Sequence, residues 1–385
     1  MNQATELGEG KPVTSQVPQG GRRRVALITN IPAPYRIPVF ERLAQYRELE
    51  ICIFYCSARE PNRDWNMGRG RYRHTFMRER ILTWRGRYIH INPDIWGELK
   101  RFSPDVVITT GFNPTHLLAY AYARFHGVLH IPMTDGTVVS ERTLGFWHRL
   151  VRKHVYRHSA AFVGASLGSL DLYRAYGARA SALFQSHLCT DNAVYPGVPK
   201  SARRFDFIFC GRFAPVKLPG FAIDVAQSAS HRLGRKTSLL FVGSGELESR
   251  LRSQAARVSE DVECEFAGFA TQAELPGYYA AARIMLFPTL YDPWGVVANE
   301  ACAAGLPVLT MASAGVAGEL VRDGENGYIL ERDLERWTDA ACALLSDPAL
   351  YAAQSARSRE LVASYHYDNA AKGIADAVTF ALESR

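Results

Sequence analysis

The chain consists almost throughout of short apolar segments, each followed by a segment with the spacing of an amphipathic helix. Apolar runs occupy 24–29, 105–110 and 128–134, and a second series of the same kind extends from about 205 to 329. Such alternation predicts parallel strands joined by crossover helices that cover both faces of a sheet. We therefore expect an α/β fold made of two doubly wound, Rossmann-like domains that face each other across a cleft.

The alternation is interrupted at 195–204, where two prolines, a glycine and a charge cluster indicate a linker. A chain of 385 residues also exceeds what one hydrophobic core usually serves. The predicted parts are a disordered tail over 1–24, an N-terminal domain over 25–197, a C-terminal domain over 198–364 and a last helix over 365–385 that packs back toward the first domain. Within the domains we expect one long helix over 140–158 and another over 314–321.

Composition excludes several classes of protein. A hydrophobic content of 47% and a charged content of 22% are typical of globular domains, and no apolar stretch is long enough to span a bilayer. The polar first residues lack the apolar core of a signal peptide, so we expect a cytoplasmic protein. The seven cysteines are scattered without metal-ligand spacing, which favours buried free thiols in a reducing compartment.

Positive charge is concentrated between Arg59 and Arg87, a segment with nine arginines and three acidic residues, interleaved with aromatic side chains. One hypothesis is a surface patch for anionic lipid head groups, on the inner face of the cell membrane, or for a polyanionic acceptor. The alternative is a solvated basic loop. Nucleic acid is not an expected partner, because no nucleic-acid-binding motif accompanies the charge.

Two carboxylates stand eight positions apart in FPTLYDPWGVVANEACAAGLPV, residues 287–308. Asp292 follows a predicted strand, and Glu300 lies within a helix that starts near Gly295. Free N–H groups at a helix start favour an anion such as a diphosphate, and carboxylates accept hydrogen bonds from hydroxyl pairs. The pattern suits a nucleotide-sugar, with contacts from Asp292, Glu300, Trp294, Gly295 and Val296.

A second motif, FCGRFAPVK, places Arg212 and Lys217 beyond the end of a predicted strand. Two cations in that position suit a diphosphate leaving group, whose negative charge grows as the bond to the sugar breaks. A third motif, FVGSGELES, provides Gly243 and Gly245 for close backbone approach to a ligand. Glu248 occupies the position of the third glycine of a dinucleotide-binding motif, so a nicotinamide or flavin site is only weakly supported.

Together these motifs resemble glycosyltransferase family 4, a group of retaining enzymes with the GT-B fold. The resemblance covers nearly the whole chain and is strongest from about 205 to 330. Asp292 and Glu300 match the family's acid-x7-acid motif, with Asp where Glu is usual, and Arg212 and Lys217 match its phosphate-binding cations. The segment FAGFATQAELPGYYAAA is similar to the one whose backbone reads the nucleobase, here near Gly268 and Phe269.

The resemblance implies a metal-independent, retaining transferase that moves a hexose-type sugar from a nucleoside-diphosphate sugar to a saccharide or polyprenyl-linked acceptor, in polysaccharide or glycolipid biosynthesis. It implies no cofactor beyond the donor, which the C-terminal domain would bind while the N-terminal domain binds the acceptor. The chain contains no Asp-x-Asp metal motif. Arg212, Lys217 and the helix start would replace the charge of a metal ion. Asp292 is assigned to positioning the sugar and supporting the transition state, not to covalent attack.

Acceptor-side candidates come from the N-terminal half, where ITNIPAPYRIPVFERL is similar to the acceptor-side loop of family members that build bacterial surface polysaccharides. Tyr35 and Arg36 lie at the first strand-to-helix turn, and Gly111 and Asp135 follow later predicted strands. His116 is more consistent with a packed helix residue. Two alternatives remain open, a nucleotide-sugar epimerase or hydrolase on the same fold, and a non-catalytic module that binds a nucleotide or polyanion.

Overall fold

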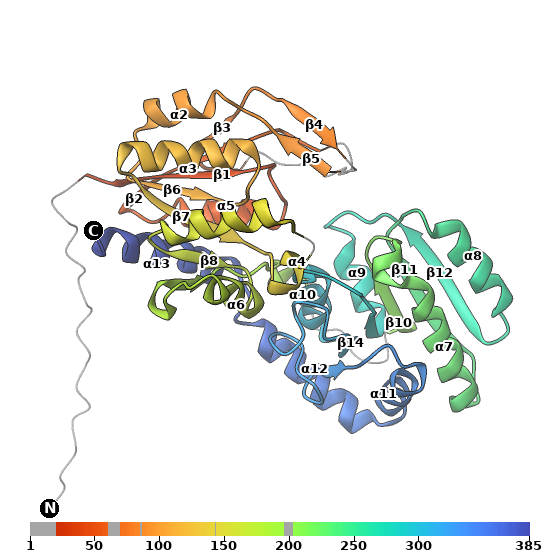
Figure 1. The fold of residues 1–385 in the computed structure, drawn as a ribbon. Coiled ribbons are helices and arrows are strands. Elements are labelled where there is room, and N and C mark those ends of the chain that lie inside the picture. The colour runs from red at the N-terminus through yellow and green to blue at the C-terminus, as the bar shows by residue number, and fades with distance from the viewer. Residues whose placement is uncertain (1–20, 61–69, 85–86, 143, 196–202) are drawn as a thin grey trace, which may run out of the picture.

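The computed structural model describes residues 21–60, 70–84, 87–142, 144–195 and 203–385, and Figure 1 shows their arrangement. Most of the predicted tail, most of the predicted linker and the middle of the segment between Arg59 and Arg87 lie outside the described residues. The first strand begins at Arg23, two residues inside the stretch that the sequence assigned to the tail.

The N-terminal domain is built on a seven-stranded sheet in the order β3-β2-β1-β6-β7-β8-β9, in which every pair of neighbours is parallel. Its strands are β1 (Arg23–Thr29), β2 (Leu49–Tyr55), β3 (His74–Phe76), β6 (Val106–Thr109), β7 (Leu129–Thr134), β8 (Phe162–Gly164) and β9 (Leu183–Gln185). The register pairs Val25 with Ile51 on one side and with Val106 on the other, so β1 lies inside the sheet.

Helices connect these strands and cover the sheet, as the alternating sequence predicts. They are α1 (Ile37–Leu43), α2 (Ile95–Phe102), α3 (Pro114–His126), α4 (Val138–Glu141), α5 (Phe146–Arg157) and α6 (Leu167–Ala175). An antiparallel hairpin of β4 (Ile81–Trp84) and β5 (Arg87–His90) stands apart from the main sheet. The sequence analysis did not predict this hairpin.

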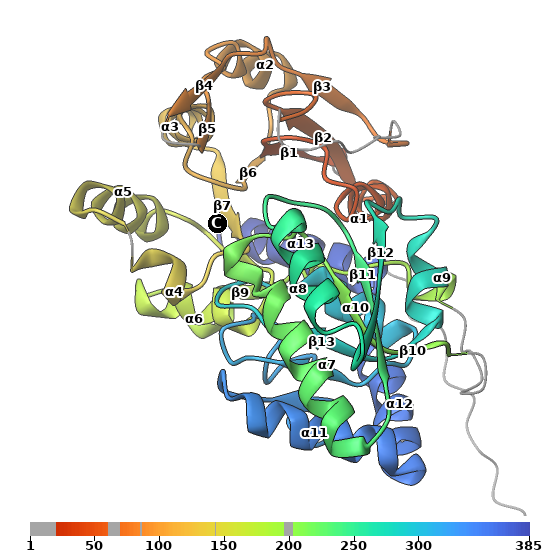
Figure 2. The same cartoon turned by 90° about the vertical axis from the view of Figure 1, so that its right-hand side faces the viewer.

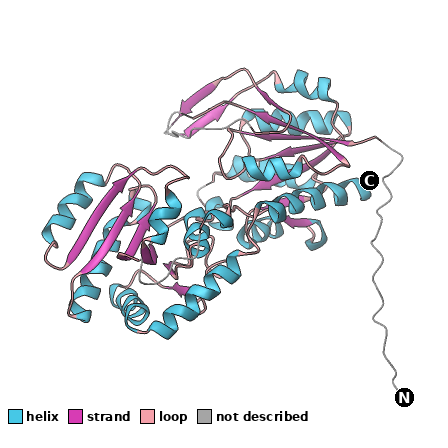
Figure 3. Ribbon diagram, turned by 180° about the vertical axis from the view of Figure 1, so that it is seen from behind, coloured by secondary structure: helices cyan, strands magenta, loops and turns pink. Residues whose placement is uncertain are grey.

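The C-terminal domain has a six-stranded parallel sheet in the order β12-β11-β10-β13-β14-β15. Its strands are β10 (Phe205–Cys210), β11 (Thr237–Val242), β12 (Val262–Gly268), β13 (Ala282–Phe287), β14 (Val308–Thr310) and β15 (Gly327–Ile329). The helices are α7 (Pro219–Leu233), α8 (Glu248–Arg257), α9 (Leu275–Ala280), α10 (Val296–Ala303), α11 (Leu334–Ser346) and α12 (Pro348–Val362). Figure 3 shows the two groups of strands, each flanked by helices.

The last helix, α13 (Tyr367–Glu383), belongs to the C-terminal end of the chain but packs on the N-terminal domain, against α1 and β9. Figures 1 and 2 both show α13 beneath the N-terminal sheet. Its buried side includes Ile374 and Val378, and an added Cβ at Gly373 would lie 1.7 Å from the carbonyl oxygen of Gln185. Close helix–strand contact therefore joins the end of the chain to its first half.

The central strands are buried on both faces because helices lie above and below them. All six residues of β10 are buried, as are Val25 to Ile28 of β1. Such strands consist of near-continuous apolar residues, which is why their positions are readable in the sequence. All seven cysteines are free thiols, and all except the half-buried Cys264 are buried.

Two predicted helices differ from the structure. The long helix expected over 140–158 is divided into α4 and α5, and α5 begins only after Gly145, whose extended backbone precedes the helix. The helix expected over 314–321 is absent; this segment forms turns with a bridge between Ala317 and Val321. There, the N–H groups of Gly315 and Val316 donate to the carbonyls of Asp292 and Trp294, which replaces helical pairing by contacts with another loop.

Candidate active site

The carboxyl ends of β10, β11 and β12 are joined by backbone hydrogen bonds in which glycine N–H groups donate. Gly211 N–H donates to Val242 O at 2.9 Å, and Gly243 N–H donates to Gly268 O at 2.7 Å. Gly243 has a φ of 132°, and an added Cβ would lie 2.1 Å from Gly211 O. An added Cβ at Gly245 would lie 2.6 Å from the carbonyl oxygen of Phe213. Glycines at the ends of these three strands leave the backbone uncovered by Cβ atoms, so a ligand can approach it closely. We call Gly211, Gly243 and Gly268 the glycine edge.

Lys217 and Asp292 are ion-paired at this edge, with 2.5 Å between Nζ and Oδ2. Lys217 follows β10 in a short 3-10 turn over Pro215–Lys217, and Asp292 follows β13. Lys217 Nζ also donates to Tyr291 O at 3.2 Å, while the second Asp292 oxygen accepts from the Trp294 N–H at 3.1 Å. Both side chains are mostly buried, so the cation and the carboxylate are held in fixed positions.

The corner between Asp292 and α10 has a specific backbone conformation. Gly295 precedes α10 with a φ of 101°, and an added Cβ would lie 2.5 Å from the Phe287 ring. The half-buried Val296 opens the helix, and no side chain caps its start among the described residues. The start of α10 therefore lies beside Phe287, the last residue of β13.

Trp294, which the sequence suggests as a nucleotide-sugar contact, has a buried side chain. Its indole is fully buried, and Nε1–H donates to Asn299 Oδ1 at 2.7 Å. The ring packs against Tyr365 and His187, which come from distant parts of the chain. Only the backbone of Trp294 can therefore approach a ligand, and the side chain shapes the corner from inside.

Glu300 lies one turn into α10 and is only 6% exposed. The Tyr279 hydroxyl donates to Glu300 Oε2 at 2.8 Å, and Tyr195 also hydrogen-bonds to the carboxylate. Burial raises the pKa of Glu300 to about 7, against the opposing effect of the two tyrosines. The sequence analysis did not identify these tyrosines, because Tyr279 reads as an ordinary helix residue and Tyr195 falls in the predicted linker.

The remaining C-terminal candidates lie on the surface of the same edge. Arg212 directly follows Gly211 and is exposed. Phe269 directly follows Gly268 and is also exposed. Neither side chain is buried by its own domain, so both are available to a ligand.

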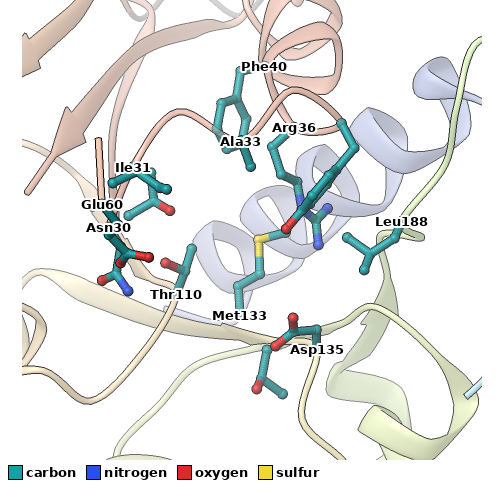
Figure 4. A pocket seen from close by; sticks show the side chains of 13 residues that line it. Asn30, Ile31, Ala33, Arg36, Phe40, Glu60, Thr110, Met133, Asp135 and Leu188 are labelled. Carbon is teal, nitrogen blue, oxygen red and sulfur yellow. The ribbon is translucent and has the colours of Figure 1, made fainter. Parts of the chain in front are cut away.

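Three of the four acceptor-side candidates, all except Gly111, line a cavity of about 200 Å³ in the N-terminal domain. In Figure 4, Arg36 and Asp135 enter this space from opposite sides, with Met133 between them. Arg36 Nη1 donates to Ser186 Oγ at 3.1 Å. Burial lowers the pKa of Arg36, because desolvation disfavours its charged form, while Tyr35 and Asp135 favour that form. Tyr35 lines the same cavity.

A second cavity, of about 280 Å³, is lined by both domains. Gly111 and Asp135 contribute from the N-terminal sheet, and Tyr291 and Pro293 contribute from the loop that holds Asp292. Asp135 therefore borders both cavities, and the loop between β13 and α10 faces the acceptor-side candidates. His116 is buried within α3, and burial lowers its pKa to about 3, as expected for a packed residue.

The sequence analysis missed several residues of this second cavity. Arg152 and Glu141, which form an ion pair at 3.0 Å, and Tyr156 line it from α4 and α5. No distinctive motif contains them. Tyr291 was also missed, although it directly precedes the carboxylate that the sequence did identify.

The described residues contain no group of three or more His, Cys, Asp or Glu side chains arranged to hold a metal ion. Likewise, no helix among them is both long enough and apolar enough to cross a bilayer.

Known proteins match this chain both in sequence and in fold. Residues 196–361 match the family of glycosyl transferases group 1. A D-inositol 3-phosphate glycosyltransferase from Acidothermus cellulolyticus is 31% identical over 187 residues, which cover 46% of this chain and 41% of that protein. An uncharacterized glycosyltransferase, MJ1607, from Methanocaldococcus jannaschii is 27% identical over 179 residues, covering 46% and 45%. The alignments thus span less than half the length of these relatives.

Solved structures match over more of the chain. Anabaena Alr3699/HepE in complex with UDP and glucose has a TM-score of 0.70 at 13% identity, over 93% of this chain and 100% of that one. Sucrose-phosphate synthase from Thermosynechococcus elongatus has a TM-score of 0.68 at 17% identity, over 94% and 100%. The chain has the GT-B fold. This confirms the predicted fold class, and in a GT-B protein the cavity lined by both domains lies between its two Rossmann-like halves.

Proposed function

We propose that the protein is a retaining, metal-independent hexosyltransferase. It uses a nucleoside-diphosphate sugar as donor and a saccharide or polyprenyl-linked acceptor. The observation that supports this most is the ion pair of Lys217 and Asp292 beside the glycine edge of the C-terminal sheet. The loop that carries Asp292 faces Gly111 and Asp135 of the N-terminal domain across the second cavity. A donor at the glycine edge would hold its sugar where an acceptor from the N-terminal domain could reach it.

The donor's diphosphate is assigned to Arg212, Lys217 and the start of α10. Arg212 is exposed at the end of β10, and Lys217 follows five residues later in a short 3-10 turn. Permanent cations and uncapped N–H groups stabilise the charge that grows on the β-phosphate as the bond to the sugar breaks. These groups supply the positive charge that a metal ion supplies elsewhere, so we expect transfer without added divalent cation and without a cofactor.

Asp292 is assigned to orienting the sugar. One of its oxygens is engaged by Lys217 and the other by the Trp294 N–H, so the carboxylate has a fixed direction and a reduced nucleophilicity. That supports acceptance of a sugar hydroxyl hydrogen bond over covalent attack on the anomeric carbon. Lys217 would exchange part of its contact with Asp292 for the incoming phosphate, which carries more negative charge.

Glu300 and the strand-end residues are assigned to the nucleoside. Glu300 would accept from the ribose hydroxyls with the small part of its carboxylate that stays exposed. Gly243, Gly245, Gly268 and Phe269 would border the base and phosphates. The fold's similarity to proteins solved with UDP and with UDP-glucose supports a donor of this chemical class.

The acceptor is assigned to the two cavities, with Tyr35, Arg36, Gly111 and Asp135 as its contacts. Their mixture of a cation, a carboxylate and polar backbone suits a molecule with many hydroxyl groups. The similarity in fold to WaaG, described as involved in lipopolysaccharide biosynthesis, supports a role in polysaccharide or glycolipid synthesis.

A thermal-shift panel of nucleoside diphosphates and their sugars tests donor binding, since a ligand of the folded state raises the melting temperature. Lys217→Ala should abolish the shift given by the preferred diphosphate. Lys236→Ala, an exposed lysine on the same domain, should leave it unchanged. If no nucleoside diphosphate stabilises the wild-type protein, the donor assignment is wrong.

A second experiment separates transfer from the alternatives. The preferred donor is incubated with and without lipid-linked or saccharide acceptors, and the products are analysed for glycoside, free sugar and epimer. Transfer with retained anomeric configuration supports the proposal. Free sugar or an epimer in the absence of acceptor would favour a hydrolase or epimerase, and binding without turnover would favour a non-catalytic module.

A further inference from the structure

Large apolar side chains stand exposed on two consecutive short helices of the N-terminal domain. In α5, Phe146 is 72% exposed and Trp147 is 73% exposed, and the two rings contact each other edge-on at 5.5 Å. The other members of the group are Leu150 and Val151 in α5 and Val138 and Val139 in α4. Isolated exposed apolar residues are ordinary, but six within fourteen positions are a concentration that indicates a binding partner.

A basic stripe accompanies these apolar residues. Arg149, Lys153 and Arg157 follow one another at intervals of four, which places them along one side of α5. All three are exposed, and no ion pair joins them to a carboxylate within the described part of the chain. Together with the six apolar residues they define what we call the α4–α5 face.

The opposite side of α5 faces the protein. Val155 and Tyr156 are buried, and Arg152 turns inward to pair with Glu141 and to lie over the Phe112 ring at 4.2 Å. The helix is therefore fixed to the domain by one side while its aromatic and basic side faces solvent. Figure 2 shows α5 at the left margin of the molecule with α4 beside it.

The charges and aromatic residues of the α4–α5 face indicate what kind of partner binds to it. A second copy of this chain would bring two basic stripes together, and like charges oppose such an interface. Aromatic side chains beside lysine and arginine are instead the pattern of helices that lie in the head-group region of an anionic bilayer. The rings enter the acyl boundary while the cations meet lipid phosphates. Long basic side chains also keep their charge in water while their stems lie on apolar surface.

We propose that the α4–α5 face is a membrane-docking surface for anionic phospholipid bilayers. It differs from the segment between Arg59 and Arg87, the surface that the sequence suggested. Part of that segment lies outside the described residues, and its Arg73 is paired with Glu50 at 2.7 Å. The α4–α5 face combines exposed aromatic residues with basic residues that form no ion pair in the described part of the chain, and both kinds lie on α5.

Docking by this face also has a consequence for the cavity between the domains. Ser140, Glu141, Arg152 and Tyr156, from the inner side of the same two helices, line that cavity. A bilayer on the outer side would therefore lie one helix thickness, about 10 Å, from the cavity wall. In this step the inference rests on the proposed function, because it implies that a polyprenyl-linked acceptor reaches the cavity from the membrane.

The test uses the full-length protein and sedimentation with two kinds of vesicle, pure phosphatidylcholine and phosphatidylcholine with one quarter phosphatidylglycerol. Wild type should sediment with the anionic vesicles and at least tenfold less with the neutral ones. The double variant Phe146→Ser, Trp147→Ser should bind anionic vesicles at least tenfold more weakly. Phe125→Ser, on α3 and 78% exposed, is the matched control and should bind like wild type.

A second variant isolates the charge. Arg149→Gln, Lys153→Gln, Arg157→Gln should remove most of the salt dependence that wild type shows, since screening weakens only the electrostatic part of binding. Both variants should keep the wild-type melting temperature, because the changed side chains are exposed. No substrate is present, so a failure here leaves the proposed transfer reaction untouched.

Three results would overturn the inference. One is equal binding of wild type and both variants to anionic vesicles. Another is the absence of wild-type binding to either vesicle. The third is a wild-type dimer in light scattering that the Phe146, Trp147 variant dissociates while vesicle binding is unchanged; the face would then be an interface between copies of this chain.

Discussion

Replacing Glu300 by Gln should make the unliganded protein more stable at neutral and alkaline pH. Glu300 is 6% exposed, and burial raises the pKa of its carboxyl to about 7 from an ordinary value of 4.5. Between these two pKa values the folded state binds more protons than the unfolded state, so the stability of the wild type falls as pH rises. Gln carries no charge at any of these pH values and still accepts a hydrogen bond from Tyr279.

The size of the effect follows from the pKa difference. Each pKa unit corresponds to about 1.4 kcal/mol, so ionising the buried carboxyl costs about 3 kcal/mol above pH 7. The stability of Glu300→Gln relative to wild type should therefore rise by about that amount between pH 4.5 and pH 7 and stay level above it. Any fixed difference in packing between the two side chains shifts the whole curve without changing its slope.

Urea unfolding of both proteins at several pH values between 4.5 and 8 measures this directly. Glu383→Gln, at an exposed carboxylate near the end of α13, provides a control that should show no such rise. A difference between Glu300→Gln and wild type that does not change with pH would refute the reasoning, because the carboxyl would then be solvated in the folded protein. The same variant should weaken nucleoside-diphosphate binding if Glu300 contacts the ribose, so stability and affinity should change in opposite directions.

Three further substitutions have outcomes that the structure specifies. Gly243→Ala should lower the free energy of unfolding by about 1–3 kcal/mol or more, through backbone strain and collision with the Gly211 carbonyl. Gly177→Ala, where φ is also positive but no atom is close, should lower it less, and thermal melting compares the two variants. Trp294→Phe should cost about 1–3 kcal/mol in urea unfolding, because the buried Asn299 oxygen loses its donor. Glu319→Ala should cost a similar amount by the same measurement, since its carboxylate accepts hydrogen bonds from the N-terminal domain.

The strands were predictable because burial on both faces requires an apolar run, and a run of that kind is visible without knowledge of its partners. Thus β6, whose four residues are all buried, lies within the apolar run over 105–110. The segment over 314–321 shows the limit of this reasoning. Its apolar residues have helical spacing, but the N–H groups of Gly315 and Val316 donate to carbonyls of the loop around Asp292, and a contact between distant segments leaves no local pattern.

The candidate site likewise contains residues that the sequence identifies and contacts that it does not. Asp292 and Lys217 were identifiable because each follows a recognisable strand, and parallel strands bring their carboxyl ends to one edge. That they pair with each other depends on β10 and β13 being neighbours in the sheet, which sequence order alone does not determine. The burial of the Trp294 side chain was not predictable either, since the residues that cover it come from distant parts of the chain.

The position of α13 has a consequence for synthesis of the chain. This helix completes the packing of α1 and β9, yet it is synthesised after every strand of both sheets. The C-terminal sheet can therefore form before α13 emerges from the ribosome. The N-terminal domain keeps an uncovered apolar face until α13 is available, so removal of α13 should destabilise the N-terminal domain more than the C-terminal one.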